Sequence, residues 1–146
     1  MKKGILAVSF GTSHIDTMEK TIDVLEKEFA KTFEEAAVYR AFTSNMIIKK
    51  LKRTANIKVQ TVGEALEKMA ADGIEEVIVQ PTHVINGIEN DRMLQEVMEH
   101  MHLFRKVYVG KPLLSSVEDY KKAIHAVMEK TVIGEDEMLV LMGHGT

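Results

Sequence analysis

The chain opens and closes on the same short pattern, an uninterrupted apolar run that leads into a glycine turn with hydroxyl side chains. The first copy covers residues 5–13 and the second covers residues 138–146. A continuous apolar run is typical of a strand covered on both faces, as in a parallel sheet. A helical pattern follows the first turn, whereas the sequence stops at the second. We therefore expect residues 1–146 to form one lobe, with residues 138–146 as the first strand of a second.

Short apolar runs alternate with helical patterns between these two copies. Strands are expected at residues 4–10, 37–42, 76–80, 106–109 and 138–142. Met18, Ile22, Leu25 and Phe29 recur at helical spacing, and Thr61-x-x-Glu64 is a capping box. This alternation predicts an α/β fold, a three-layer αβα lobe with a parallel sheet of four to five strands and helices on both faces.

Composition excludes several classes of function. The 146 residues contain no cysteine, which excludes disulfides, thiolate metal sites and cysteine nucleophiles. A net charge of −3 gives no reason to expect nucleic acid or an anionic membrane as a partner. The apolar run near the N-terminus is too short for a signal peptide, and no run reaches transmembrane length. A reducing cytoplasm is the expected location.

Candidate site residues follow the predicted strands, because ligands of open parallel sheets bind at the carboxyl ends of the strands. The polar or glycine residues at these positions are Ser9, Gly11, Thr12, Ser13 and His14; Thr43, Ser44 and Asn45; Thr82, His83, Asn86 and Glu89; Ser115 and Ser116; and His144 and Thr146. Three of the six histidines belong to this set.

His144 is the sharpest candidate, since flanking glycines expose the backbone and allow close approach of a ligand. Its imidazole is suited to bind a divalent metal or to accept a proton near neutral pH; a structural bond to a backbone carbonyl is the alternative. His83 either touches the ligand or is structural. Glu89 is either a metal ligand or base, or an acid that stabilises a helix start. The turn at Gly11 is suited to hold a carboxylate or phosphate, although one glycine is a weak signal.

Five motifs occur in order along the whole chain: Ser9-Phe10-Gly11-Thr12-Ser13, Arg40-Ala41-Phe42-Thr43-Ser44 followed by Met46-Ile47-Ile48, His83-Val84-Ile85-Asn86-Gly87, Pro112-Leu113-Leu114-Ser115-Ser116 and Met142-Gly143-His144-Gly145. Together they resemble the anaerobic cobalt chelatases of the CbiK type, which belong with the ferrochelatase-like chelatases. The resemblance implies half of a bilobal fold, the N-terminal lobe plus the start of the second, with a tetrapyrrole in the cleft between the lobes.

The resemblance also implies a sirohydrochlorin cobaltochelatase, a lyase that inserts Co²⁺ into sirohydrochlorin, or its oxidised relative, in the anaerobic route to cobalamin. His144 would contact the metal and accept a pyrrole proton. The implied substrate-binding residues are Ser9, Phe10, Gly11, Thr12, Ser13, Thr43, Ser44, His83, Glu89, Ser115 and Ser116. The expected partners are the tetrapyrrole, the divalent metal and a second copy of the chain, and no prosthetic group is expected.

Some alternatives stay open from the residues alone. Co²⁺, Ni²⁺ and Fe²⁺ all accept imidazole, so the choice of metal is not fixed. The chain is alternatively a non-catalytic lobe that only binds a tetrapyrrole or a metal. A receiver or flavodoxin-like protein is a further alternative, but Ser9-Phe10-Gly11 lacks the acidic cluster of receivers, and Gly-Thr-Ser is only a fragment of a flavodoxin phosphate loop.

Overall fold

The computed structural model describes residues 1–143 and 145, and the chain divides into two compact units. The first unit, Met1–Leu113, contains the sheet. The second unit begins at Leu114 and contains one helix. Each unit is described by itself.

The sheet of the first unit has four parallel strands: β1 (Lys3–Ser9), β2 (Ala36–Phe42), β3 (Glu76–Pro81) and β4 (Lys106–Val109). Their order is β2-β1-β3-β4, so β1 lies between β2 and β3. Ser9 at the end of β1 pairs with Phe42 at the end of β2, and Val8 pairs with Pro81 at the end of β3. The residues that follow β1, β2 and β3 therefore meet at one edge of the sheet. The predicted parallel sheet is confirmed.

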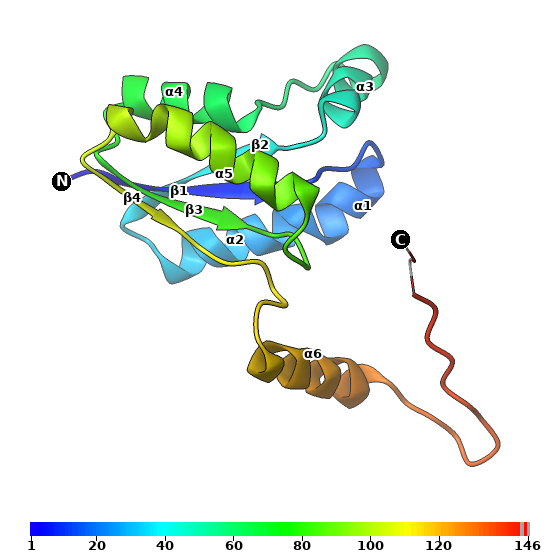
Figure 1. The fold of residues 1–146 in the computed structure, drawn as a ribbon. Coiled ribbons are helices and arrows are strands. Elements are labelled where there is room, and N and C mark those ends of the chain that lie inside the picture. Colours follow the sequence, from blue (N-terminus) through cyan, green and yellow to red (C-terminus); the bar gives the residue numbers. More distant parts are fainter. Residues whose placement is uncertain (144, 146) are drawn as a thin grey trace. The chain divides into compact units, whose positions relative to one another are not determined.

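Helices cover both faces of this sheet, as predicted. They are α1 (Ile15–Lys20), α2 (Ile22–Thr32), α3 (Asn45–Ala55), α4 (Val62–Ala71), α5 (Ile88–His100) and the short 3₁₀ helix η1 (Met101–Leu103). In Figure 1, α4 and α5 lie on one face, and α1 and α2 lie on the other. No helix in the described residues is long and apolar enough to cross a membrane.

Local capping explains where two of the helices begin. Ser44 precedes α3, and its Oγ accepts a hydrogen bond from the backbone N–H of Ile47 at 3.3 Å. Thr61 and Glu64 form the predicted capping box at the start of α4, in which each side chain accepts a hydrogen bond from the other residue's backbone N–H. These bonds satisfy N–H groups that have no partner inside the helix.

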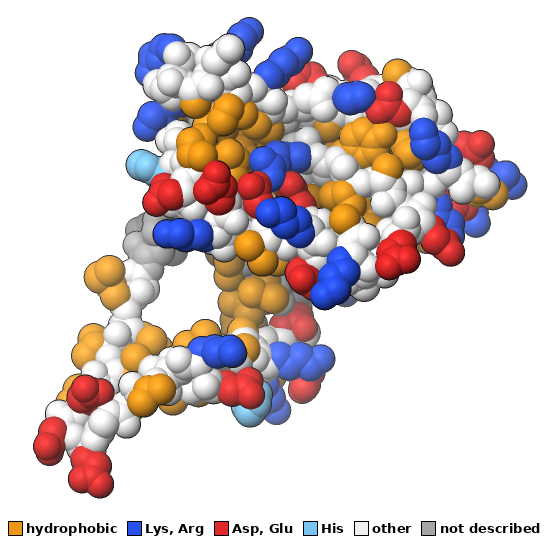
Figure 2. Space-filling model, turned by 180° about the vertical axis from the view of Figure 1, so that it is seen from behind, with side chains coloured by type: hydrophobic (Ala, Val, Ile, Leu, Met, Phe, Trp, Pro, Cys, Tyr) orange, Lys and Arg blue, Asp and Glu red, His pale blue; other side chains and the backbone are white. Residues whose placement is uncertain are grey.

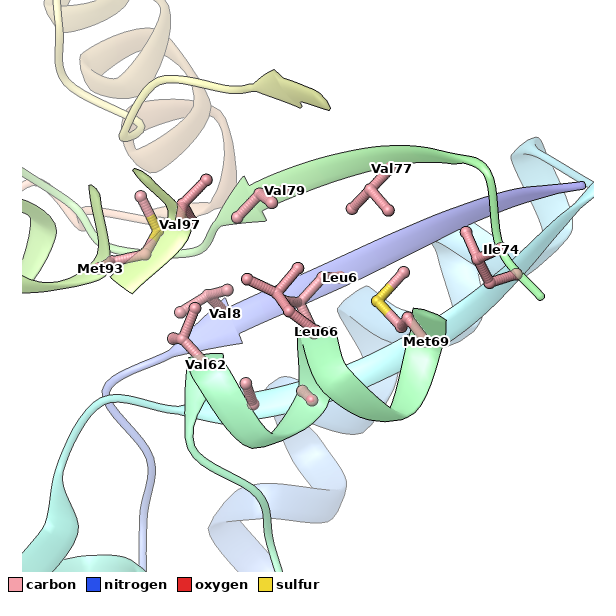
Figure 3. Close-up of a cluster of buried hydrophobic side chains, with 12 residues drawn as sticks. Leu6, Val8, Val62, Leu66, Met69, Ile74, Val77, Val79, Met93 and Val97 are labelled. Carbon is pink, nitrogen blue, oxygen red and sulfur yellow. The ribbon is translucent and has the colours of Figure 1, made fainter. Parts of the chain in front are cut away.

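The main core lies between the sheet and the α4–α5 layer (Figure 3). β1 and β3 alternate their side chains between the two faces, and Leu6 and Val79 are among those on this side. They pack against apolar residues of the two helices, such as Leu66 of α4 and Met93 of α5. Leu6, Val79 and Met93 are completely buried, and Leu66 is nearly so. This packing fixes β1 and β3, whose carboxyl ends carry the candidate site.

A second cluster joins α1, α2 and α3 to the end of β2. Its buried members are Met18, Ile22, Phe42, Leu51 and Val59. Phe42 is the last residue of β2, and its ring is almost fully buried. The cluster therefore holds the first helices next to the turn that follows β1.

The surface in Figure 2 carries Lys and Arg side chains interspersed with Asp and Glu side chains, and hydrophobic patches lie between them. The charges of both signs are mixed, so no continuous patch of one sign forms on this face. Among the described residues, the exposed apolar side chains include Met98 of α5 and Tyr108 of β4.

The second unit contains α6 (Val117–Lys130), which begins at the predicted serine pair. Ser116 Oγ accepts a hydrogen bond from the backbone N–H of Asp119 at 3.2 Å. The Asp119 carboxylate in turn accepts a hydrogen bond from the backbone N–H of Ser115 at 3.1 Å. α6 has no buried residue, and its apolar positions, such as Ile124, are exposed.

The strand expected at residues 138–142 is not formed, which corrects the sequence-based expectation. Residues 138–142 have no regular secondary structure, and Met138, Val140, Leu141 and Met142 are largely exposed. A strand exists only where neighbouring backbone groups complete its hydrogen bonds. In the described part of the second unit, no strand is present for this segment to pair with. An apolar run alone is therefore not sufficient to form a strand.

Candidate functional site

A pocket of about 800 Å³ opens at the carboxyl ends of β1 and β3. Three segments form its walls: the turn after β1, the first helices, and the loop from β3 into α5. Its apolar lining includes Phe10, Ile22 and Ile88, and its polar lining includes hydroxyls, His83 and Glu89. An open parallel sheet is expected to hold its ligand at this position.

The turn after β1 requires glycine at position 11. Gly11 has a φ of +104°, a conformation that side chains rarely adopt. A Cβ on Gly11 would also lie 2.5 Å from Cδ2 of Phe42. Backbone bonds from Thr43 N–H to the Ser9 carbonyl and from Ser44 N–H to the Phe10 carbonyl hold the turn in place. The close fit of glycine on the Phe42 ring thus shapes one wall of the pocket.

Two hydroxyls connect the ends of β1 and β3. Ser9 Oγ and Thr82 Oγ1 lie 2.6 Å apart and share a hydrogen bond. The backbone N–H of Thr82 donates to the Val8 carbonyl at 2.8 Å. The chain therefore leaves β3 in a fixed direction, and His83 follows directly.

His83 and Glu89 place buried polar atoms without partners in the pocket wall. Both ring nitrogens of His83 and Oε2 of Glu89 are shielded from solvent, and none has a hydrogen-bond partner among the described residues. Burial lowers the pKa of His83 below its ordinary value of 6.5, and the negative charge of Glu89 opposes this shift in part. His83 is therefore neutral near pH 7, with a nitrogen lone pair available. Unpaired buried groups are costly, which is typical of a site prepared for a ligand.

The second oxygen of Glu89 contacts Arg92. Nη1 of Arg92 donates to Oε1 of Glu89 at 3.1 Å, one helical turn further along α5. The Arg92 side chain is 65% exposed, whereas the Glu89 side chain is 29% exposed. The pocket thus places an arginine and a glutamate near the neutral His83.

The structure brings together six of the predicted substrate-binding residues, which line the pocket: Ser9, Phe10, Gly11, Thr12, His83 and Glu89. Ser13, Thr43 and Ser44 lie next to the lining but are not part of it, and the Ser44 hydroxyl caps α3. Ser115 and Ser116 belong to the second unit, where Ser116 caps α6. The predicted catalytic residue His144 lies outside the described residues.

Sequence reasoning missed lining residues that lie one or two turns into a helix. They include Thr17, Thr21 and Ile22 in and between the first helices, and Ile88 and Arg92 in α5. The rule that ligands bind at the carboxyl ends of strands points only to residues directly after a strand. The spacing of Arg92 three residues after Glu89 was a usable signal, since such a pair shares one face of a helix.

Within the described residues, no group of three or more histidine, aspartate or glutamate side chains is arranged to hold a metal ion. His83 and Glu89 alone provide two such side chains in the pocket. The described part of the chain therefore offers at most a partial set of metal contacts here.

The four-stranded parallel sheet, with a pocket at its carboxyl edge, has a counterpart among solved structures. A protein named for cobalamin (vitamin B12) biosynthesis, CbiX from Marinobacter aquaeolei VT8, superimposes with a TM-score of 0.57. The match covers 89% of this chain and 94% of that chain, at 16% sequence identity. At this identity the likeness establishes the fold alone, and it defines the class of fold as an α/β lobe with a parallel sheet.

Sequence comparison identifies the family. A sirohydrochlorin cobaltochelatase from Salmonella typhimurium is 42% identical over 99% of this chain and 55% of its own length. The sirohydrochlorin cobaltochelatase CbiKC from Nitratidesulfovibrio vulgaris is 33% identical over 99% of this chain and 52% of its own length. The profile of the cobalt chelatase (CbiK) family matches residues 3–146. The chain belongs to the cobalt chelatase (CbiK) family, as the motifs predicted, and spans about half the length of these relatives.

Proposed function

We propose that this chain acts in sirohydrochlorin cobaltochelatase activity, the insertion of Co²⁺ into sirohydrochlorin or its oxidised relative in anaerobic cobalamin biosynthesis. The observation that carries the proposal is the family match over residues 3–146, which includes every segment of the pocket. The names of the two curated relatives supply the activity.

Metal insertion requires that two pyrrole protons leave the ring and that ring nitrogens replace water on the metal. Both tasks suit a neutral imidazole, which holds a borderline metal and accepts a proton near neutral pH. On the family resemblance, His144 has these roles. His83, which is neutral and has no partner for its ring nitrogens in the described residues, is a second imidazole that lines the pocket.

The pocket supplies groups that suit a tetrapyrrole with carboxylate substituents. Phe10 is 46% exposed and presents a ring surface on which the macrocycle can stack. Hydroxyls and backbone N–H groups near the turn would receive carboxylates; the candidates in the first unit are Ser9, Gly11, Thr12, Ser13, Thr43 and Ser44. Ser115 and Ser116 of the second unit are proposed on the family resemblance alone.

Cobalt enters this proposal as a substrate, and the proposal includes no prosthetic group. Affinity for nitrogen ligands alone would favour Ni²⁺ over Co²⁺, so selectivity for cobalt must come from geometry and metal supply. Parallel insertion assays with Co²⁺, Ni²⁺ and Fe²⁺ measure that selectivity directly.

The test is anaerobic Co²⁺ insertion into sirohydrochlorin by the 146-residue chain, followed by the change in its visible spectrum. We expect insertion above the rate without protein, and we expect His144→Ala to abolish the difference. An unchanged rate in His144→Ala would contradict the role of His144. A rate equal to the protein-free rate would contradict catalysis by this chain.

A second candidate is a lobe that binds the tetrapyrrole or metal without catalysis. The observation that favours it is that the chain spans only 55% and 52% of the two relatives. Tight sirohydrochlorin binding with no cobalt insertion is the result expected for this candidate.

Self-association is the arrangement we propose for an active 146-residue chain, with two copies supplying the two sides of the site. Sedimentation velocity measured with and without sirohydrochlorin tests it. A purely monomeric chain that still inserts cobalt would exclude the arrangement.

A further inference from the structure

Arg92 is the only lysine or arginine among the described residues that line the pocket. Its position follows from the helix that carries it: α5 starts at Ile88, directly after the loop that holds His83. Arg92 lies in the second turn of α5, on the same side as Glu89, with which it forms the ion pair. Among the described residues, a single positive charge therefore lies at the rim of a pocket that is otherwise lined by apolar groups, hydroxyls, an amide, the neutral imidazole of His83 and one carboxylate.

The Arg92 guanidinium has N–H donors that make no hydrogen bond to a described residue. An arginine carries five N–H donors in a flat fork, and only Nη1 of Arg92 makes a hydrogen bond to a described residue. The side chain is 65% exposed, so the remaining donors face solvent or the pocket opening. A fork of this kind matches the two oxygens of a carboxylate better than a lysine does.

We propose that Arg92 is a carboxylate-binding residue of this pocket and that Glu89 occupies its guanidinium when no ligand is present. The ligand class is a tetrapyrrole with several carboxylate substituents, and the inference rests on the proposed function. A carboxylate on the ligand reproduces the interaction that the Glu89 carboxylate makes in this structure. Arg92 then determines which edge of the macrocycle enters the pocket, because no other lysine or arginine of the described residues lines it.

The ion pair with Glu89 has a consequence for ligand binding. Glu89 holds the Arg92 side chain at the rim, which reduces the number of conformations that ligand binding has to restrict. A ligand carboxylate that binds Arg92 shares or displaces the 3.1 Å contact to Oε1 of Glu89. The carboxylate of Glu89 is then released beside His83, within the same pocket.

The experiment is an anaerobic binding titration of metal-free sirohydrochlorin, monitored by its absorbance, on the 146-residue chain. The variants are Arg92→Gln, Arg92→Lys and the control Arg53→Gln, which removes the same charge from an exposed position on α3 away from the pocket lining. The methyl ester of sirohydrochlorin serves as a second ligand with the same ring and no carboxylates.

We expect Arg92→Gln to raise the Kd for sirohydrochlorin about fivefold, the usual size for a partly exposed ion pair. Arg92→Lys should give an intermediate Kd, and Arg53→Gln should match the unmodified chain. The ester should bind Arg92→Gln and the unmodified chain equally. The effect on sirohydrochlorin should also shrink between about 0.05 M and about 0.5 M salt, as expected for a charge interaction.

Each other outcome overturns a distinct statement. Equal Kd values for sirohydrochlorin in Arg92→Gln and the unmodified chain would refute the role of Arg92 and leave the proposed function intact. Equal weakening of acid and ester would assign Arg92 to wall packing in place of carboxylate binding. Absence of any binding to the unmodified chain would overturn the proposed function and this inference together.

Discussion

Gly11 shows how one residue sets the shape of the pocket. We expect Gly11→Ala to lower the free energy of unfolding by about 1–3 kcal/mol, because alanine must adopt a strained φ and press on a buried ring. Phe42 is only 1% exposed, so its ring has no free space to move into. Urea denaturation measures the loss.

Gly87, which also lines the pocket, is the matched control. Its φ is −147°, and a Cβ there would meet no atom within 4 Å. Gly87→Ala should therefore cost less than about 1 kcal/mol, mainly through the weaker helix cap that alanine makes. Equal losses at Gly11 and Gly87 would show that the contact with Phe42 is unimportant.

His83 predicts a pH dependence of stability. Its pKa in the folded protein lies below the ordinary value of 6.5, mainly because of burial. As the pH falls below about 6.5, the unfolded chain takes up a proton at His83 before the folded chain does. The free energy of unfolding should therefore decrease from about pH 6.5 down to the folded pKa, and His83→Gln should remove this part of the decrease. Urea denaturation over a pH series tests it, and parallel profiles for the two proteins would contradict it.

At the scale of elements, Arg40 links β2 to α2. Its Nε donates to Oε1 of Glu26 at 2.8 Å, and its Nη2 pairs with both Glu26 and Asp23. These carboxylates, Glu26 above all, raise the pKa of Arg40, so Arg40 stays positively charged beside them. Arg40→Met should destabilise the fold by about 1–3 kcal/mol, because two partly buried carboxylates are left close together.

Lys68→Met is the control for that prediction. Lys68, in the last turn of α4, pairs at 2.8 Å with Asp72, which caps the end of that helix, but the two side chains are 51% and 35% exposed. Its loss should cost about 0.5 kcal/mol or less. Thermal unfolding of both variants compares the two pairs, and an Arg40→Met loss no larger than that of Lys68→Met would show that Arg40 does not tie the strand to the helix.

The elements that sequence alone located best are those with a complete local signal. The apolar run at β4 was predicted at residues 106–109, and the structure has Lys106–Val109. The capping box at Thr61 fixed the start of α4 because both partners lie within four residues. The run at 138–142 has the same local signal, but no strand forms there, since strand pairing depends on distant residues. Sequence can show that a segment favours a strand; it cannot show that a neighbour is available.

The candidate site likewise contains residues that local sequence predicts and residues whose position depends on distant parts of the chain. The turn residues Gly11 and Thr12 were predicted because they follow a strand directly, and the carboxyl edge of a parallel sheet is a rule of topology. Arg92 was not predicted, because its place at the rim depends on how α5 leaves the loop after β3. The hydrogen bond between Ser9 and Thr82 likewise joins residues that are 73 positions apart.

At the scale of the whole molecule, the exposed run 138–142 predicts self-association. Val140 and Leu141 are each 77% exposed and lie in a segment with no charge and no proline. Val140→Lys should weaken association about tenfold or more, because a buried valine contributes about 1.5 kcal/mol or more to an apolar contact. Sedimentation velocity over a concentration series measures it. Met98→Lys, at an exposed apolar position of α5, is the control that should leave the association constant unchanged.

The order β2-β1-β3-β4 has a consequence for how the chain reaches its structure. β1 is synthesised well before β3, yet Lys3 of β1 pairs with Glu76 of β3, far along the sequence. Pairings between such distant residues are slow to form, and an apolar strand that waits for its neighbour is exposed to aggregation. During synthesis, only β2 and the helices between β1 and β2 are therefore available to cover the apolar side chains of β1 until β3 leaves the ribosome. Slower translation of residues 43–81 would lengthen the time for which β1 lacks β3. Chaperone binding to the nascent chain should be strongest while these residues are translated.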